Sequence, residues 1–331
     1  MGPLALDPLP LATLPSPDLS EDQVMRFVAG LRPYRSGTVR IEAEQLGQQS
    51  IIHHYGHGGA GFTLSWGTAD EAADLLAQHQ APPARVAVLG GGVIGLTTAA
   101  VLLERGYVVT LYAKALSPNT TSDLAGAQFA PSLVECDSRD RLDRWVRASA
   151  QRFLKLRGDT YGVYERPNYA TPGAGSALTR LPTDLFPMRE LDALPFAGTR
   201  RAGRVHQTLL IEPPIYLPRL LRRVYELGGL ALTRTFESAE QIAALPQRAI
   251  VNCLGLGSRD LFPDRALQPM RGQLVHLQPQ DLPYLLSHSG YLFPRNDALV
   301  LGGTVERGES RAQPNRAACL RILDNHRRFF A

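Results

Sequence analysis

The sequence predicts an α/β protein of two domains, one built on a parallel sheet and a smaller one on an antiparallel sheet. Three observations support this fold class. Residues 86–95 have the composition of a buried strand, a glycine turn and a helix start, the order that opens a βαβ unit. The last sixty residues contain short apolar runs separated by turn residues, as in an antiparallel sheet. A chain of 331 residues is long enough for about two domains.

The segment before the glycine turn is expected to hold two helices and two strands. Ser20 to Gln23 have the spacing of a capping box and Gly30 is a stop signal, which together predict a short helix. Residues with high β-propensity predict the strands, and apolar residues at helical spacing predict the longer helix. The expected elements are a helix at 21–29, strands at 38–41 and 51–52, a helix at 63–76 and a linker at 78–84.

The elements that follow divide between the two domains. Those expected around the parallel sheet are strand 85–89, helix 93–105, strand 107–112, helix 217–227 and strands 230–236 and 248–253. Strands at 272–277, 290–294 and 299–303 are expected to form the antiparallel sheet. The nucleotide-binding domain is therefore assigned to 45–135 and 213–265, and the second domain to 18–44, 136–212 and 266–331.

Composition argues against several classes of protein. The net charge of +4 comes from scattered arginines, which form no basic stripe for nucleic acid. No run approaches the ~20 apolar residues of a membrane span, and the first twenty residues lack a basic leader region. The three cysteines are widely spaced, as expected for reduced thiols in a cytoplasmic protein. A homo-oligomer is compatible with the sequence.

The glycine turn after strand 85–89 carries the first functional motif. Gly90, Gly92 and Gly95 satisfy the GxGxxG pattern between a strand and a helix, which predicts a Rossmann-like dinucleotide site. The acidic residue that usually ends the second strand is replaced by Lys114. This lysine either faces solvent or donates to a ribose or phosphate of the cofactor.

A second glycine loop precedes the first in the chain. Residues 58–61 open the helix expected at 63–76, and unpaired amides at a helix start suit the pyrimidine edge of a flavin, although an ordinary glycine loop explains them equally well. The neighbouring His53, His54 and His57 lack a rigid helical face and an acidic or thiolate partner for zinc. We therefore expect no metal site, and local packing or hydrogen bonding for one or two of these rings.

Several blocks of this sequence resemble the D-amino acid oxidase family, in a rotated order. The matching blocks are residues 85–96, 120–125, 251–255, 268–273 and 301–303, followed in the family's usual order by residues 32–33 and 54–61. This resemblance implies a circular permutant. The usual termini would be joined through 78–84, and the new ends would open between Ala331 and about Asp18.

The resemblance implies FAD as cofactor and assigns roles to individual residues. Arg32 falls on the arginine that grips the substrate carboxylate, Tyr291 on the tyrosine whose hydroxyl meets the same group, and Gly59 on the carbonyl that accepts from the substrate amine. Leu286 and Ala130 fall in the side-chain pocket, to which we also assign His54. The FAD contacts implied are Arg40, Gly58, Gly59, Ala60, Gly61, Phe62, Thr63, Gly90, Gly92, Val93, Ile94, Gly95, Thr121, Ser122, Gly126, Ala127, Gln128 and Phe236, with Lys114 beside them.

The activity implied is oxidative deamination of neutral or hydrophobic D-amino acids by hydride transfer to flavin N5. The products would be 2-oxo acids, ammonia and hydrogen peroxide, so the partners are a D-amino acid and molecular oxygen. A glycine or sarcosine-type amine oxidase and a D-aspartate oxidase remain open as alternatives. A non-catalytic protein that binds a flavin or another ligand is the alternative from a different class.

Overall fold

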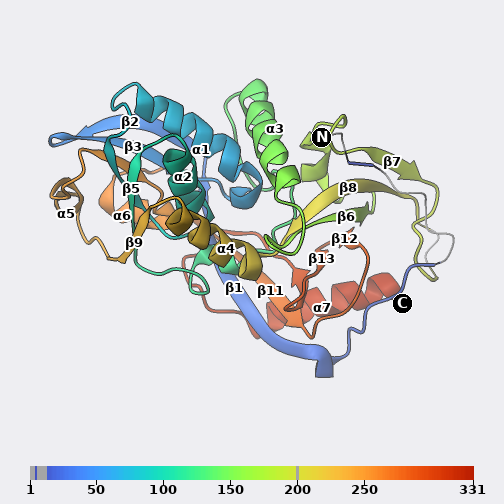
Figure 1. The fold of residues 1–331 in the computed structure, drawn as a ribbon. Helices are drawn as coiled ribbons and strands as arrows, with labels where there is room; N and C mark the ends of the chain where they lie inside the picture. The colour runs from blue at the N-terminus through green and yellow to red at the C-terminus, as the bar shows by residue number, and fades with distance from the viewer. Residues whose placement is uncertain (1–3, 6–12, 199–200) are drawn as a thin grey trace.

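Two sheets organise the computed structural model, which describes residues 4–5, 13–198 and 201–331 (Figure 1). One sheet has six strands in the order β2-β3-β10-β4-β5-β9, and the other has nine, in the order β1-β11-β14-β13-β12-β6-β8-β7 with β15 added beside β11. Among the described residues, no helix is long and apolar enough to cross a membrane.

The strands are β1 (Val24–Arg35), β2 (Arg40–Leu46), β3 (Gln49–Tyr55), β4 (Arg85–Leu89), β5 (Val108–Ala113), β6 (Val163–Ala170), β7 (Met188–Leu191), β8 (Gly203–Ile211), β9 (Leu230–Thr233), β10 (Ala249–Asn252), β11 (Leu267–Leu277), β12 (Leu285–Ser287), β13 (Tyr291–Pro294), β14 (Leu299–Gly302) and β15 (Glu306–Arg307). The α-helices are α1 (Gly61–Ala77), α2 (Val93–Glu104), α3 (Arg139–Lys155), α4 (Pro213–Glu226), α5 (Ala239–Ala243), α6 (Ser258–Leu261) and α7 (Arg316–Phe330). Short 3-10 turns are η1 (Glu21–Gln23), η2 (Thr121–Leu124), η3 (Ser176–Arg180) and η4 (Gly255–Gly257).

The six-stranded sheet is the predicted parallel sheet. Strands β3, β10, β4, β5 and β9 run parallel, and only β2 is antiparallel, as the hairpin partner of β3. Helices α1 to α4 contribute to the core on one face, while Ile242 of α5 and Phe262 after α6 cover the other (Figure 1). Burial on both faces explains why β4 and β10 are apolar without alternation.

The helix predicted over residues 21–29 is wrong. Only the 3-10 turn η1 forms there, and β1 begins at Val24. β1 pairs antiparallel with β11 along almost its whole length, from Val24 opposite Leu277 to Arg35 opposite Leu267. The inter-strand hydrogen bonds to β11 outweigh the local preference for a helix. The sequence pattern missed this strand because its pairing partner is distant in the chain.

The structure also moves the expected domain boundaries. The boundary at residue 44 falls inside β2, all of which belongs to the six-stranded sheet. Helix α3, absent from the predicted elements, packs beside α1 and buries Trp145 and Phe153 in the core of the same domain. The stretch from 136 to 155 therefore belongs with the parallel sheet and not with the second domain.

Residues 14–19 lie close to the C-terminal helix α7. Arg327 in the last turn of α7 donates from Nε to the carbonyl of Leu19, 2.9 Å away. Leu19 and Phe329 belong to one buried cluster. The ring of Phe330 lies 5.6 Å from that of Phe196, and Phe196 is bridged to Leu14. We propose that the chain is a circular permutant in which α7 and β1 are consecutive elements of the usual order.

A rearranged chain tests this proposal. A chain that starts at residue 83, joins residue 331 directly to residue 13 and ends at residue 78 is expected to have a melting temperature within about 4 °C of that of the original. A control opened between Ile250 and Val251, inside a buried strand, is expected not to fold. Failure of both rearranged chains to fold would contradict the proposal.

Candidate active site

Two glycine loops meet at the carboxyl edge of the parallel sheet. The loop after β3 leads into α1, and the loop after β4 leads into α2. The first residues of the two helices are neighbours, since a Cβ added to Gly61 would lie 3.5 Å from a methyl of Val93. The helix starts therefore direct unpaired amides and two positive dipole ends into one region, which suits an anionic cofactor.

The glycines of the second loop have steric reasons to be glycine. Gly90 has φ of +115°, a conformation that L side chains avoid. A Cβ on Gly95 would overlap the carbonyl oxygen of Gly90, so α2 approaches its strand closely only because that side chain is absent. The turn can therefore bring its backbone close to a pyrophosphate.

The turn η2 links this cradle to the second sheet. Ser122 accepts at Oγ from the amide of Val93, the first residue of α2, at 3.0 Å. Asp123 closes a capping box with Thr120 and holds the turn in place. The next residue, Leu124, packs with Tyr291 against an apolar cluster on the nine-stranded sheet. One short segment thus contacts both the nucleotide cradle and the second domain.

Arg32 and Tyr291 come together on one face of the nine-stranded sheet, although they lie near opposite ends of the sequence. Arg32 lies on β1 and its guanidinium crosses Gly272 of β11, while the ring of Tyr291 on β13 crosses Gly302 of β14. A Cβ on either glycine would overlap the side chain above it. The glycines give both groups room to lie flat over the sheet.

The electrostatics of this pair favour a neutral phenol beside a cation. Burial raises the pKa of Tyr291, and the charge of Arg32 together with a hydrogen bond from it acts in the opposite direction without cancelling the increase. The phenol therefore keeps its proton at neutral pH. Arg32 also donates from Nη1 to the carbonyl of Thr304, 3.2 Å away. The pair offers several donors to a carboxylate.

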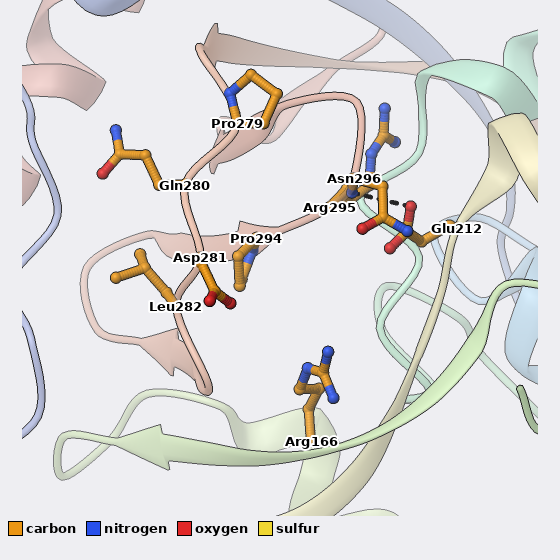
Figure 2. A pocket seen from close by; sticks show the side chains of 9 residues that line it. All are labelled: Arg166, Glu212, Pro279, Gln280, Asp281, Leu282, Pro294, Arg295 and Asn296. Atoms are coloured by element: carbon orange, nitrogen blue, oxygen red, sulfur yellow. Dashed lines mark hydrogen bonds between the residues drawn. The ribbon is translucent and has the colours of Figure 1, made fainter. Parts of the chain in front are cut away.

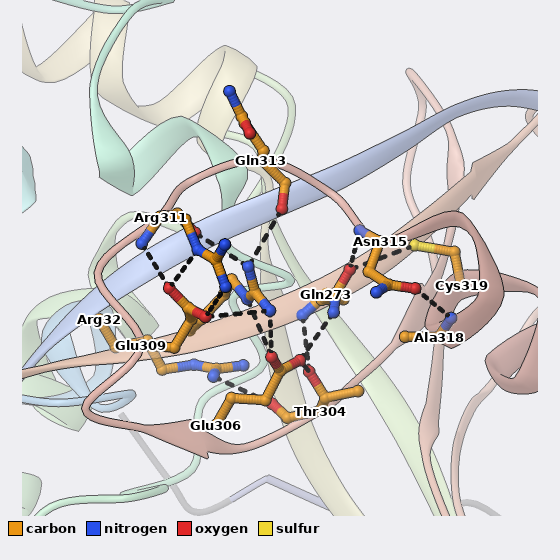
Figure 3. A network of polar contacts seen from close by, with 11 residues as sticks. Arg32, Gln273, Thr304, Glu306, Glu309, Arg311, Gln313, Asn315, Ala318 and Cys319 are labelled. Atoms are coloured by element: carbon orange, nitrogen blue, oxygen red, sulfur yellow. Dashed lines mark hydrogen bonds and ion pairs between the residues drawn. The ribbon is translucent and has the colours of Figure 1, made fainter.

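A polar network holds the loop that carries Thr304 (Figure 3). Glu306 accepts from Arg271 Nε at 2.9 Å and from Gln273 Nε2 at 2.7 Å. The Thr304 hydroxyl donates to the same carboxylate at 2.8 Å and accepts from the amide of Gln273 at 3.1 Å. Arg271 and Gln273 flank Gly272 on β11, so their side chains lie on the sheet face opposite to the guanidinium of Arg32, and no sequence motif marks their roles.

The loop that contains Gly59 lies against the strand that contains Arg32. The amide of Gly58 donates to the carbonyl of Pro33 at 2.9 Å, and His57 is bridged to Tyr34. The amide of Gly59 faces the carbonyl of Leu133 at 3.4 Å. The first glycine loop is thus part of the same region as Arg32, next to the start of α1.

The structure corrects the pocket prediction for Leu286. Its direct partners in the sheet are Leu292 and Tyr169, and all three face the cluster covered by α7. Side chains alternate along a strand, so the face of Tyr291 carries Ser287 and Leu285 instead. A one-residue difference in register places Leu286 in the core, a distinction that sequence resemblance could not resolve.

The other two pocket predictions fall on the parallel-sheet domain. Ala130 is buried, and its amide and carbonyl both bond the hydroxyl of Thr63 in the first turn of α1. His54 ends β3 and turns its Nδ1 toward Thr98 of α2, at 3.0 Å. His54 is fully buried, and its ring meets that of His57 edge to face, so its assignment to the substrate pocket stays a prediction.

All three histidines have local hydrogen-bond partners, where the sequence predicted this for one or two of them. His53 contacts Glu44 at 3.1 Å and Asn252 at 3.0 Å, and His57 contacts Thr68 at 3.0 Å. Burial lowers the pKa of each ring, that of His57 to about 3. Within the described part of the chain, no three acidic, histidine or cysteine side chains gather as metal ligands.

The pKa of His57 predicts how stability depends on pH. The folded pKa of about 3 lies below the unfolded value of 6.5, so the unfolded chain binds the extra proton between these values. The contribution of His57 to the free energy of unfolding is therefore fully present above pH 6.5. It decreases as the pH falls below this value, by at most about 1.4 kcal/mol per pH unit.

Urea unfolding between pH 7 and 4 measures the slope. His57→Gln is expected to flatten it, whereas His79→Gln, a change at an exposed side chain, is expected to leave it as it was. An equal slope in the His57 variant would mean that this ring does not carry the effect.

The remaining predicted cofactor contacts lie on different elements, Arg40 and Phe236 at opposite edges of the parallel sheet and Ala127 beside β8. Arg40 bonds Tyr55 at 2.7 Å and Glu42 at 2.8 Å; burial lowers its pKa, but these partners raise it by more. Phe236 follows β9 and stacks edge to face with Tyr112. Lys114 follows β5 and is exposed. Ala127 has φ of +58°, which is unusual for a residue with a side chain.

A separate pocket of about 280 Å³ opens beside the strand that carries Tyr291 (Figure 2). Arg166, Arg295, Glu212 and Asp281 line it, and Arg295 lies closest in sequence to Tyr291. Because charges of both signs surround it, and because neither Arg32 nor Tyr291 contributes, we assign the pocket no part in binding the cofactor or the substrate.

Comparisons with known proteins agree with this geometry. The family model described as FAD dependent oxidoreductase (DAO) matches residues 11–75 and 85–331, on either side of the expected linker. A D-amino-acid oxidase of Streptomyces coelicolor is 33% identical over 70% of this chain and 72% of its own, and the human D-aspartate oxidase is 28% identical over 72% and 74%.

Solved structures show a similar fold. The crystal structure of glycine oxidase from Geobacillus kaustophilus superposes with a TM-score of 0.54 and 18% identity, over 75% of this chain and 78% of that one. The family match spans nearly the whole sequence, including both glycine loops and the residues of the Arg32 and Tyr291 face. The chain therefore belongs to the DAO family of FAD-dependent oxidoreductases, and it is an enzyme that uses FAD.

Proposed function

We propose that the enzyme oxidises D-amino acids with neutral or hydrophobic side chains to 2-oxo acids, ammonia and hydrogen peroxide. The observation that carries this proposal is the convergence of Arg32 and Tyr291 on one sheet face, with Leu124 of the cradle turn η2 packed beside Tyr291. A cation and a neutral phenol are matched to the carboxylate of an amino acid.

The residues of the cradle fit FAD. The starts of α1 and α2 supply backbone amides for the pyrimidine edge and for the pyrophosphate of FAD. Gly90 and Gly95 allow the backbone to approach the pyrophosphate closely, and Ser122 borders the first turn of α2. When bound, FAD supplies the hydride acceptor at N5, and molecular oxygen reoxidises it with formation of hydrogen peroxide. Water hydrolyses the imino acid product to the 2-oxo acid and ammonia.

The protein's own part is to orient the substrate. Arg32 and Tyr291 hold the carboxylate, and the carbonyl of Gly59 accepts from the amine, since its loop is bonded to the strand of Arg32 through Pro33. With the carboxylate and the amine held and the side chain in its pocket, only the D-enantiomer directs its Cα–H toward the cofactor. The neutral amine assists departure of the hydride, so no side chain needs to act as base.

The neighbours of Tyr291 support an apolar side-chain pocket. Phe293 stacks on Tyr291 with ring centroids 4.4 Å apart and forms a buried cluster with Leu285 and Leu210. These residues replace Leu286 as the basis for the substrate preference. An apolar lining favours D-methionine or D-phenylalanine, whose side chains gain by leaving water, over D-aspartate, whose carboxylate loses its hydration.

A second candidate function, oxidation of acidic D-amino acids, is favoured by polar groups on the same face. Asn168 accepts from Ser287, the sheet partner of Tyr291, at 3.1 Å, and His206 is the sheet partner of Asn168. Asn168 Nδ2 and both ring nitrogens of His206 are buried without a hydrogen-bond partner. Such donors suit a side-chain oxygen.

A peroxide-coupled screen of paired D- and L-amino acids, with glycine included, tests the proposal. D-methionine and D-phenylalanine are expected to react faster than D-aspartate, glycine and every L-amino acid. A D-aspartate rate above that of D-methionine would transfer support to the acidic candidate, and turnover of glycine alone would favour a glycine oxidase. Activity with L-amino acids only would overturn the proposed orientation.

A further inference from the structure

Tyr291 is contacted from the rear of the sheet by a residue that the proposed reaction does not use. His326 lies on α7, which packs against β11 and β14 on the face opposite to the phenol (Figure 1). Its side chain is fully buried. The ring nitrogen Nε2 lies 3.1 Å from the backbone carbonyl oxygen of Tyr291.

The ring is itself held in a defined orientation. Nδ1 lies 2.8 Å from the carbonyl oxygen of Ile322, one turn earlier on the same helix. The ring of His288 meets it edge to face with centroids 4.4 Å apart. A Cβ on Gly290, the residue before Tyr291, would overlap the carbonyl oxygen of Gly302 and would lie 3.1 Å from Cε1 of His326, so the imidazole packs closely against this turn.

We propose that His326 is a positioning residue that fixes the backbone of Tyr291 from behind, so that the phenol is presented to the substrate carboxylate beside Arg32. Both ring nitrogens of His326 face carbonyl oxygens, each of which can accept more than one hydrogen bond. The tautomer with its proton on Nε2 donates to Tyr291, and the tautomer with its proton on Nδ1 donates to Ile322. This inference rests on the proposed function only for the identity of the substrate group.

The strand that carries Tyr291 needs such support because it is short. β13 has four residues and follows directly on the turn at 288–290. Any movement of the Tyr291 backbone also moves its phenol relative to the substrate. A displacement of about 1 Å is enough to weaken a catalytic contact by up to 10²-fold. An anchor on the buried helix α7 restricts that freedom without occupying the substrate face.

Three variants of the holoenzyme test the proposal. His326→Leu removes the polar contacts, His326→Gln keeps an amide donor, and Ile322→Val shortens a buried neighbour on the same helix without touching Tyr291. The affinity for benzoate, an unreactive carboxylate, the KM and kcat for D-methionine, and amide exchange of residues 288–294 are measured for each.

His326→Leu is expected to weaken benzoate binding and raise KM by about fivefold, the loss of one hydrogen bond, with kcat and flavin content little changed. Exchange at 288–294 is expected to accelerate. His326→Gln should recover most of both effects, and Ile322→Val should show neither. If His326→Leu does not fold, the comparison of His326→Gln with the shorter His326→Asn replaces it.

Equal benzoate affinity and equal exchange in His326→Leu and Ile322→Val would overturn the positioning role. Failure of the proposed function is distinguishable from this, because it would appear in the wild-type enzyme as an absence of D-amino acid oxidation, or as benzoate binding that Tyr291→Phe leaves unchanged. The exchange of residues 288–294 would still report whether His326 holds the strand.

Discussion

Arg32→Met is expected to lower kcat/KM for D-methionine by about 10²- to 10⁴-fold, with flavin still bound. The change removes two charge-assisted hydrogen bonds to the substrate carboxylate, each of which contributes about 1.5 to 3 kcal/mol, and each 1.36 kcal/mol corresponds to a factor of ten. The methionine side chain fills a similar volume over Gly272, so the sheet is expected to keep its packing.

D-methioninamide provides the control for this prediction, because it lacks the carboxylate. Its slower turnover should be nearly the same in the wild type and in Arg32→Met. Arg32→Lys keeps the charge but loses the planar fork, and is expected to fall between the two enzymes. A loss of equal size for the acid and the amide would show that Arg32 supports the fold and does not grip the carboxylate.

Gly95→Val is expected to abolish FAD binding. The added side chain overlaps the carbonyl of Gly90, so α2 must move away from β4, and the amides of its first turn leave the position that receives the pyrophosphate. The ratio of flavin absorbance at 450 nm to protein absorbance measures the effect, and is expected to fall to less than about a tenth because the anion site is lost.

Gly257→Ala is the matched control, since its Cβ meets only Leu254 at 3.6 Å, an ordinary contact. Its flavin content should equal that of the wild type. Circular dichroism of both variants separates loss of the cofactor from loss of the fold. A folded Gly95→Val protein that retains its flavin would place the pyrophosphate away from the start of α2.

Local sequence determined the parallel-sheet domain well. The strand, glycine turn and helix at 85–104 could be predicted because the residues that determine them are close together in sequence. They are the apolar residues of the strand and the glycines at positions 90 and 95. The order of motifs identified the cofactor region in the same way. β1 was misread as a helix because its partner β11 lies more than 230 residues away.

The tertiary structure alone decided which residues surround Arg32 and Tyr291. Resemblance named Arg32 and Tyr291, but only the register of β1, β11, β14 and β13 places them on one face. The same alternation removed Leu286 from that face and put Phe293 there. Successive side chains of a strand point to opposite faces of the sheet, so a shift of one residue in register changes which side chains lie on a given face. The register is set by pairing between strands that are distant in sequence, which a local pattern does not show.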